Sequence, residues 1–284
     1  MSDTPINVLV AMNFSEEILN RLRAVSDRLN IVCYAGQVPT QAYADVDILY
    51  TIYNFPTPAE APNLKWIQLH FAGLDAVVNR PIVQQEHIHI TTASGIHATP
   101  IAEYCMGMML AFSLQFPKMW RLQQQAKWAD RPQDTFKPVG LRGQVLGIVG
   151  YGSIGRELAR VASALGMKIL ATKNNLLKPA EDLDYIEPNT GDPHAEIPER
   201  IYPTEALGAM VEVCDYLVVT VPLTEKTHHM INADILKRMK PSAYIINIAR
   251  GAVIDESALI EALQNGTIAG AGLDVFEEEP LPAT

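Results

Sequence analysis

Short apolar runs alternate with amphipathic and polar stretches through the first third of the chain. Ser15 can cap a helix that continues to about Arg28. This alternation of strand-type and helical segments predicts a small open parallel sheet with helices on its faces. The strand-type runs cover residues 6–12, 30–34, 47–52 and 64–70.

Residues 99–128 have the pattern of a long helix, with Thr99 as N-cap and Pro100 at the first helical position. Residues 101–114 are apolar around most of the helix circumference, which is typical of a buried helix. The following turns are more amphipathic. We therefore expect a homodimer whose subunits meet through residues 101–128, with a purely intrachain core as the alternative.

A second alternating pattern begins at Val145 and includes a polar, proline-containing stretch at residues 174–205. That stretch is interpreted as an extended surface loop, either near the adenosine end of a bound dinucleotide or simply irregular. Strand-type runs cover residues 145–149, 169–172, 216–221, 243–249 and 269–276, and helical segments cover 156–165, 204–213, 232–239 and 256–265. The chain is therefore predicted to be an α/β protein with two doubly wound parallel-sheet domains, residues 1–98 and 99–284, and a cleft between them.

The turn after residue 149 carries the clearest chemical signal. Gly150, Gly152 and Gly155 have the spacing GxGxxG between a strand and a helix that closes at Gly166. The first glycine allows the tight turn, the second admits a pyrophosphate, and the third lets helix and strand pack closely. Free N–H groups at the start of that helix would bind the phosphates. The first domain lacks such a loop, so a substrate domain is expected to precede a cofactor domain.

Lys173 indicates which dinucleotide is preferred. NAD-binding units usually place Asp or Glu about 20 residues after the first glycine, where it binds the ribose hydroxyls. Here no acid occurs between Glu157 and Glu181, and the second strand ends with Lys173. A lysine would attract a 2′-phosphate, so NADP is favoured. The alternative is a solvated lysine in an enzyme that takes either NADP or NAD.

Composition narrows the function classes further. Of 284 residues, 48% are hydrophobic and 19% charged, which is typical of a globular protein, and the net charge of −10 argues against nucleic acid or an anionic membrane as the main partner. No apolar run approaches the length of a membrane span, and the N-terminus lacks signal-peptide features. Cys33, Cys105 and Cys214 are expected to be reduced core thiols in a cytoplasmic protein. No metal-ligand spacing is present, and the histidines are interpreted as surface or loop residues.

Several further motifs occur in one particular order. They are Phe71–Asp75, Ala98–Glu103, the glycine loop, Val221–Thr227, Ile248–Gly251 and Leu273–Pro280. In this order they resemble the D-isomer-specific 2-hydroxyacid dehydrogenases, and the resemblance covers the chain from about residue 47 to its end. It implies a flavodoxin-like substrate domain, a Rossmann cofactor domain, and reduction of a 2-keto acid to a D-2-hydroxy acid, or the reverse. By the lysine-ended strand, the glyoxylate and hydroxypyruvate reductases are the nearest members.

The resemblance also implies roles for individual residues. Arg250 would bind the carboxylate or keto oxygen in a bidentate manner, a planar task for which Lys is a poor substitute. The backbone N–H groups of Ala72 and Gly73 would bind the other end of the carboxylate. Asp274 would accept a hydrogen bond from the nicotinamide carboxamide, and Glu279 would orient and charge a catalytic histidine. The cofactor-binding set is Gly150, Gly152, Ser153, Ile154, Gly155, Lys173, Val221, Pro222, Thr227, Ile248, Ala249 and Asp274.

The C-terminal end departs from the family pattern. The family's histidine follows the Glu-Pro element, whereas all seven histidines here precede Glu279. We expect the chain to be truncated before its last strand and returning helix, which would leave its activity low without general-acid help worth about 10²–10⁴-fold. Two alternatives to a keto-acid reductase remain. One is a nucleotide-sensing protein like the C-terminal-binding-protein corepressors, and the other is a dehydrogenase of the same fold with another substrate, such as formate or phosphite.

Overall fold

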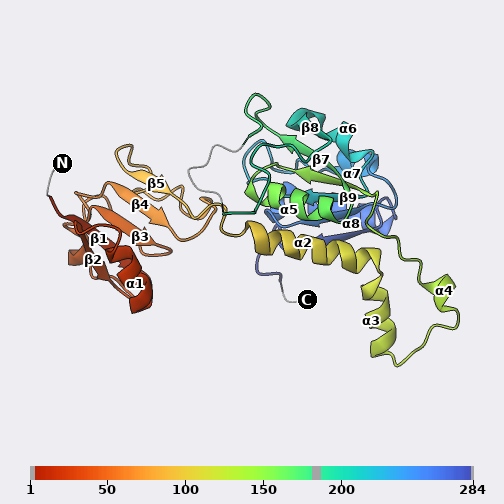
Figure 1. The fold of residues 1–284 in the computed structure, drawn as a ribbon, viewed down its shortest axis with the longest axis horizontal. Coiled ribbons are helices and arrows are strands. Elements are labelled where there is room, and N and C mark those ends of the chain that lie inside the picture. The colour runs from red at the N-terminus through yellow and green to blue at the C-terminus, as the bar shows by residue number, and fades with distance from the viewer. Residues whose placement is uncertain (1–3, 181–186, 283–284) are drawn as a thin grey trace. The chain divides into compact units, whose positions relative to one another are not determined.

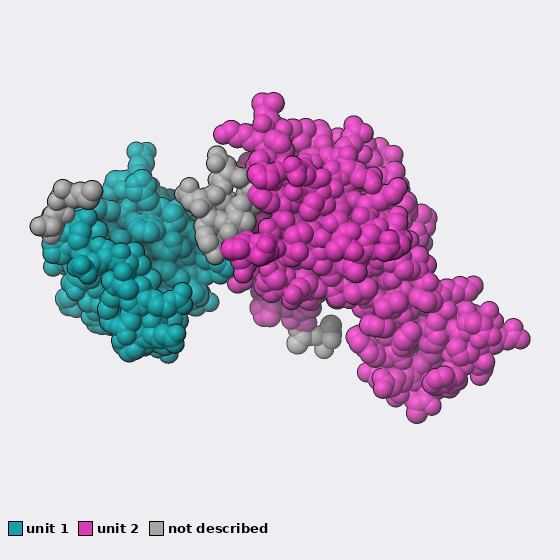
Figure 2. Space-filling view, in the orientation of Figure 1, with its two compact units in different colours: residues 1–96 teal, residues 97–284 magenta. Residues whose placement is uncertain are grey.

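The chain folds into two compact units, residues 1–96 and 97–284 (Figure 2). The structure, a computed structural model, describes residues 4–180 and 187–282. The sequence predicts the domain boundary after residue 98. The assignment of a substrate role to the first domain and a cofactor role to the second stays a prediction, as does the cleft between them.

Unit 1 is a parallel sheet of five strands in the order β2-β1-β3-β4-β5 (Figure 1). The chain starts in the interior of the sheet and winds outward in both directions, which is the flavodoxin-like order. The predicted fold class of this unit is therefore confirmed. Its elements are β1 (Ile6–Ala11), α1 (Glu16–Arg23), β2 (Leu29–Cys33), the 3-10 helix η1 (Thr40–Tyr43), β3 (Ile48–Thr51), β4 (Trp66–Leu69) and β5 (His89–Thr91).

The helix α1 is shorter than the apolar pattern predicts. Ser15 caps it as expected, since its hydroxyl accepts a hydrogen bond from the N–H of Ile18 at 3.4 Å. The helix ends at Arg23 instead of Arg28. The next large apolar residue, Val25, is 75% exposed, so packing against the sheet does not extend the helix beyond that point.

Unit 2 is a parallel sheet of six strands in the order β11-β10-β9-β6-β7-β8. Numbered from β6 as the first strand, this is the 3-2-1-4-5-6 order of the Rossmann fold. Its elements are α2 (Ala98–Ser113), α3 (Phe116–Gln124), α4 (Pro132–Thr135), β6 (Val145–Val149), α5 (Ser153–Ala164), β7 (Lys168–Lys173), β8 (Arg200–Pro203), η2 (Thr204–Ala206), α6 (Leu207–Val211), β9 (Tyr216–Val219), α7 (Ala233–Arg238), β10 (Tyr244–Asn247), η3 (Gly251–Val253), α8 (Glu256–Gln264) and β11 (Gly270–Leu273).

Each face of this sheet carries its own core. In β9 the side chains of Tyr216 and Val218 pack with α2 and α5, whereas Leu217 and Val219 pack with α6, α7 and α8. This is the period-two alternation of a strand that is buried on both faces. All four side chains of β9 are buried, so the strand reads as a continuous apolar run in the sequence.

The edge strand β8 lies in the stretch that the sequence predicts to be loop. It pairs in parallel with β7, with Arg200 opposite Leu170. A short edge strand carrying Arg200 and Pro203 has no apolar run to mark it. The prediction of an extended loop over residues 174–205 is therefore wrong at its C-terminal end.

The predicted long helix is two helices. The first, α2, begins two residues earlier than expected, with His97 instead of Thr99 as N-cap, so Thr99 lies inside its first turn. Gln115 then adopts a left-handed conformation with φ 59° and separates α2 from α3. The buried face of α2, including Cys105 and Met109, packs against α5 in the core of unit 2. That face therefore forms an intrachain core, which was the alternative interpretation.

Over residues 4–180 and 187–282, no helix is both long enough and apolar enough to cross a lipid bilayer.

Candidate active site

The glycine loop has the geometry that the motif predicts. Gly150 has φ +104°, a conformation that residues with a side chain rarely adopt. The hydroxyl of Thr220 donates a hydrogen bond to the Gly150 carbonyl at 2.7 Å, and the Gly150 N–H donates to the hydroxyl of Thr172 at 3.1 Å. A Cβ atom on Gly155 would lie 2.5 Å from the Gly150 carbonyl oxygen, so helix and loop touch as expected.

The start of α5 suits a diphosphate. No side chain caps this helix of 12 residues, so its first N–H groups, including those of Ser153 and Ile154, are not occupied by a cap. A Cβ atom placed on the exposed Gly152 would meet no atom within 4 Å, which leaves open space at the turn. Uncapped N–H groups and the helix dipole together favour an anion. The residues present therefore fit a dinucleotide.

Lys173 lies beside this loop, at the C-terminal end of β7. Its Nζ atom donates a hydrogen bond to the Tyr151 carbonyl at 3.3 Å. The second strand of a Rossmann unit ends near the adenosine ribose. The structure thus puts a positive charge where an NAD-binding unit usually carries an acid.

A buried polar cluster, formed by Tyr151, Arg156 and Asp192, ties the segment after β7 to the glycine loop. The Tyr151 hydroxyl donates to the Asp192 carboxylate at 2.5 Å, and the Arg156 guanidinium lies 4.7 Å from the centre of the Tyr151 ring. Arg156 also donates to the carbonyl oxygens of Asp192 and Pro179. Sequence reasoning missed this cluster, because only the fold brings Asp192 next to the glycine motif.

The carboxylates in this region are held ionised. Burial raises the pKa of Asp192, but hydrogen bonds from Tyr151, Ile197 and Glu196 outweigh burial, and the net pKa is lowered. The neighbouring Glu157 follows the same balance. Burial opposes its ionisation, whereas hydrogen bonds from Arg160 and from the Gly191 N–H, the latter at 2.6 Å, lower its pKa overall.

The loop after β9 closes against the glycine turn. A Cβ atom on Gly150 would lie 2.7 Å from Val221, so Val221 borders the turn directly. The Thr227 hydroxyl donates to the Pro222 carbonyl at 2.7 Å and accepts from the Thr224 N–H at 2.8 Å. Thr227 therefore shapes the loop from within, and its role as a phosphate ligand stays a prediction.

Arg250 follows β10 and is exposed, with its Nη1 atom donating to the Ala249 carbonyl at 2.7 Å. The adjacent Ile248 and Ala249 are buried. Asn247, which is only 1% exposed, fixes this turn, because its amide donates to the Arg250 carbonyl and accepts from the Ala249 N–H, each at 3.0 Å. Asn247 is a positioning residue that sequence reasoning missed.

The segment after β11 packs directly against the Arg250 turn. A Cβ atom on Gly251 would overlap the carbonyl group of Phe276, so the two backbones touch there. The carboxylate of Glu279 accepts from the Phe276 N–H at 2.8 Å and is exposed. The Asp274 N–H donates to the Asn247 carbonyl at 3.0 Å. The fold thus brings Arg250, Asp274 and Glu279 together at the carboxyl edge of one sheet, where ligands bind in open α/β folds.

The negative charge of Asp274 also raises the pKa values of two residues of α2. Burial first, and then the charge of Asp274, raises the pKa of Cys105 to about 12. The same two causes raise the pKa of Tyr104. Cys105 is therefore a neutral core thiol at physiological pH, as expected. Cys33 is also free but only half-buried, so it is not part of a closed core.

One histidine pairs with a carboxylate near the Arg250 turn. The Nε2 atom of His229 is 2.9 Å from Glu277, and the His229 N–H donates to the Ala252 carbonyl at 2.8 Å. The sequence interpretation treats the histidines only as surface or loop residues, so this pair was missed. Across residues 4–180 and 187–282 there is no group of three or more His, Cys, Asp or Glu that could hold a metal ion.

In unit 1 the predicted carboxylate loop follows β4. Ala72 is exposed and Gly73 half-buried at that turn. Just before it, the Nδ1 atom of His70 is 2.7 Å from the hydroxyl of Tyr50, and Phe14 packs 5.3 Å from the Tyr50 ring. Burial raises the pKa of Tyr50, so this hydroxyl is neutral at physiological pH. The aromatic cluster lies at the carboxyl edge of its sheet.

Comparison with known proteins gives consistent matches. Residues 106–284 match the model of the NAD binding domain of D-isomer specific 2-hydroxyacid dehydrogenases. A glyoxylate reductase from Thermofilum pendens is 35% identical over 224 residues, which are 78% of this chain and 61% of that protein. The chain therefore spans less than two thirds of that relative.

Solved structures match along nearly the whole chain. A D-isomer specific 2-hydroxyacid dehydrogenase from Xanthobacter autotrophicus, in complex with NADPH, has a TM-score of 0.75 at 26% identity, covering 97% of this chain and 83% of that one. An NADPH-dependent glyoxylate/hydroxypyruvate reductase from Sinorhizobium meliloti, in complex with NADP and malonate, has a TM-score of 0.69 at 30% identity, covering 99% and 82%.

Proposed function

This chain belongs to the D-isomer specific 2-hydroxyacid dehydrogenase family, and on that premise we propose that it reduces a small 2-keto acid to a D-2-hydroxy acid with NAD(P)H. The observation that carries the proposal is the position of Arg250 beside Asp274, in the same unit as a glycine loop that fits a diphosphate. Glyoxylate and hydroxypyruvate are the first substrates to test, because the reductases that this chain resembles are named for them.

The proposed roles follow from the chemistry of each group. The chemistry that a bound reduced dinucleotide supplies is hydride donation to the carbonyl carbon. Arg250 binds the keto acid through its planar guanidinium and stabilises negative charge that develops on the carbonyl oxygen. The Ala72 and Gly73 N–H groups bind the carboxylate, and Asp274 accepts from the carboxamide. Glu279 has the role of the family's acid, which orients and charges a histidine that follows the Glu-Pro element. A carboxylate beside an imidazole raises the pKa of the imidazole, so a proton stays available near neutral pH.

Cofactor binding is assigned to the loops at the carboxyl edge of unit 2. Phosphate contacts come from the first turn of α5 and from Thr227, and the apolar wall comes from Val221, Pro222, Ile248 and Ala249. Lys173 binds the 2′-phosphate, so NADP is preferred over NAD. The complexes of related structures with NADPH and NADP support this preference.

The cofactor preference is tested with Lys173→Asp. A carboxylate there repels the 2′-phosphate and can bind ribose hydroxyls instead, and one charged hydrogen bond is worth a factor of about 10–100. The ratio of the KM values for NADPH and NADH should therefore move towards NADH by about that factor. An unchanged ratio would reject the assignment of Lys173.

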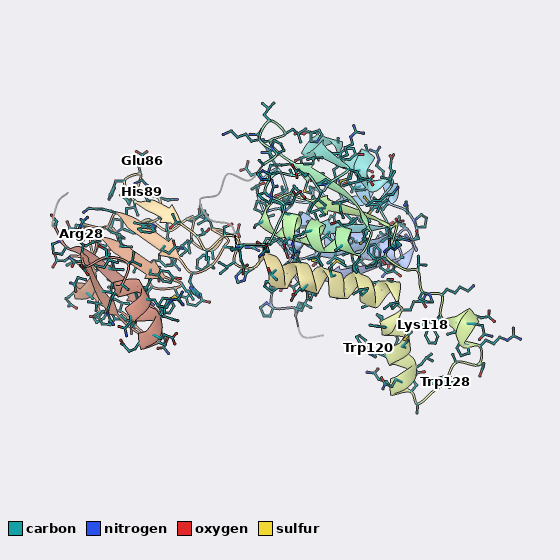
Figure 3. All side chains as sticks on the ribbon, viewed as in Figure 1. Arg28, Glu86, His89, Lys118, Trp120 and Trp128 are labelled. Carbon is teal, nitrogen blue, oxygen red and sulfur yellow. The ribbon has the colours of Figure 1, made fainter. Side chains whose placement is uncertain are left out.

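We also propose a homodimer and a cytoplasmic location. The apolar side chains left exposed on α3 and in the segment just after it, here called the α3 patch, support the dimer. They are Phe116 at 37%, Met119 at 38%, Trp120 at 57% and Trp128 at 88% exposed. Figure 3 shows Trp120 and Trp128 on the arm of unit 2 that contains α3. The rings of Phe116 and Trp120 are neighbours, with their centroids 6.1 Å apart, and exposed apolar clusters usually mark an interaction site. Three free cysteines support a reducing compartment.

The experiment that tests the function is a substrate panel. The full-length protein is assayed for consumption of NADPH and of NADH with glyoxylate, hydroxypyruvate and larger 2-keto acids, and its product is analysed for configuration. Turnover with formation of the D-isomer is expected. Tight NADPH binding without turnover of any 2-keto acid would contradict the proposal and favour a nucleotide-sensing protein.

A further inference from the structure

The cluster of Tyr151, Arg156 and Asp192 connects two parts of the candidate cofactor site. One part is the glycine loop, and the other is Lys173 at the end of β7. Tyr151 is a residue of the glycine loop itself, and its carbonyl accepts the hydrogen bond from Lys173. Its N–H donates to the Thr172 carbonyl at 2.9 Å, which fixes the loop against β7. The position of the Tyr151 backbone therefore determines where the Lys173 ammonium group is held.

Asp192 fixes the other end of the same tyrosine. Its carboxylate accepts from the Tyr151 hydroxyl at 2.5 Å and from the N–H groups of Glu196 and Ile197, each at 3.0 Å. Asp192 is 6% exposed, and Tyr151 and Arg156 are at most 1% exposed. Removing one partner from a buried charged network leaves the others poorly satisfied, so such a network permits few alternative arrangements.

The segment that carries Asp192 is bound to α5 from a second side. The Gly191 N–H donates to the Glu157 carboxylate at 2.6 Å, and Arg160 pairs with that same carboxylate. Glu157 and Arg156 are successive residues of the helix whose first turn faces the candidate phosphate site. Residues 191–197 are therefore attached both to the glycine loop and to its helix, although the sequence pattern predicts an extended surface loop.

We propose that Asp192 is a positioning residue for the cofactor site: through the Tyr151 hydroxyl it holds the Tyr151 carbonyl, and through that carbonyl it sets the position of Lys173 for the cofactor's 2′-phosphate. The inference rests on the proposed function, because it assumes that the loop binds a dinucleotide. It makes the segment after β7 part of the selectivity for NADP over NAD. NADH lacks the 2′-phosphate, so its affinity depends less on Lys173.

The test compares dissociation constants for NADPH and NADH, measured by fluorescence titration, in Tyr151→Phe and Asp192→Ala. Tyr151→Phe removes one oxygen atom and keeps the ring under Arg156, so it remains informative even where Asp192→Ala fails to fold. In each variant NADPH affinity should fall by about tenfold, the factor for one hydrogen bond to a charged group, with a smaller change for NADH. The double variant of Tyr151→Phe and Lys173→Met should have the same NADPH-to-NADH affinity ratio as Lys173→Met alone. Both changes act through the same ammonium group, so their effects on selectivity should not add.

Asp215→Asn is the matched control. The Asp215 carboxylate also accepts from a backbone N–H, that of Val145 at 2.8 Å, and pairs with Lys240 at 2.7 Å, but it lies at the amino edge of the same sheet. This variant should leave the NADPH-to-NADH affinity ratio unchanged. An unchanged ratio in Tyr151→Phe, or an equal change in Asp215→Asn, would overturn the inference while leaving the proposed function intact. Failure of the unmodified protein to bind either dinucleotide would overturn the proposed function itself.

Discussion

At the scale of single residues, the geometry of Arg250 depends on neighbours that carry no chemistry of their own. Asn247 holds both sides of the turn, and Gly251 lets the backbone of Phe276 approach it. The family motif identifies Arg250 and Gly251 but gives no reason why a glycine follows the arginine. The structure explains the glycine as a steric requirement, because any side chain there meets a carbonyl group.

This requirement predicts the effect of Gly251→Ala. The added methyl group must displace the Phe276 carbonyl, and overpacking of this kind costs about 1–3 kcal/mol of unfolding free energy. The displacement also shifts Arg250, so kcat/KM for the keto acid should fall more than the affinity for NADPH. Urea unfolding and steady-state kinetics measure both effects.

Gly140→Ala provides the comparison for this change. A Cβ atom on Gly140 would meet nothing within 4 Å, so the variant should keep both stability and kcat/KM. Equal behaviour of the two alanine variants would show that the contact between Gly251 and Phe276 is not needed for the site.

At the scale of elements, the segment that contains Asp192 should make stability depend on acid pH. The folded-state pKa of Asp192 is lowered, so the ionised carboxylate stabilises the folded protein above its unfolded pKa of about 4. That contribution is lost as the pH falls through the folded-state pKa. Thermal unfolding from pH 7 to pH 3 should therefore show a steeper loss of Tm in the unmodified protein than in Asp192→Asn. Parallel curves would contradict this account.

The same elements show how far sequence patterns reach. Strands with continuous apolar runs, such as β6 and β9, were predicted because burial on both faces leaves a run in the sequence. The edge strands β5 and β8 were missed, since three or four residues with exposed polar positions carry no such signal. The break between α2 and α3 was also missed, because it depends on a left-handed Gln115 instead of a glycine or proline.

Site residues divide in the same way. Those in local motifs, such as Gly150 and Arg250, could be named from the sequence because the motif and its chemistry occupy a few consecutive positions. Tyr151 and Asp192 are 41 positions apart, and their contact exists only after β7 and the following segment have folded. No local pattern could have indicated that contact.

At the scale of the whole molecule, the α3 patch predicts self-association. Trp120→Glu places a charge in the patch and should shift a dimer towards monomer in light scattering at micromolar concentration. Val25→Glu is the control, because Val25 is 75% exposed but belongs to unit 1 and is not a residue of the α3 patch. A monomeric unmodified protein, or equal masses for both variants, would contradict the proposed homodimer.

The central claim is that the guanidinium of Arg250 binds a 2-keto acid beside a dinucleotide held by the glycine loop. The most direct test is kcat/KM for hydroxypyruvate at saturating NADPH in the full-length protein and in Arg250→Lys, together with the dissociation constant for NADPH. Lysine keeps the charge but loses the bidentate geometry, so kcat/KM should fall by about 10–100-fold while NADPH affinity stays constant. Unchanged kcat/KM in Arg250→Lys would contradict the account.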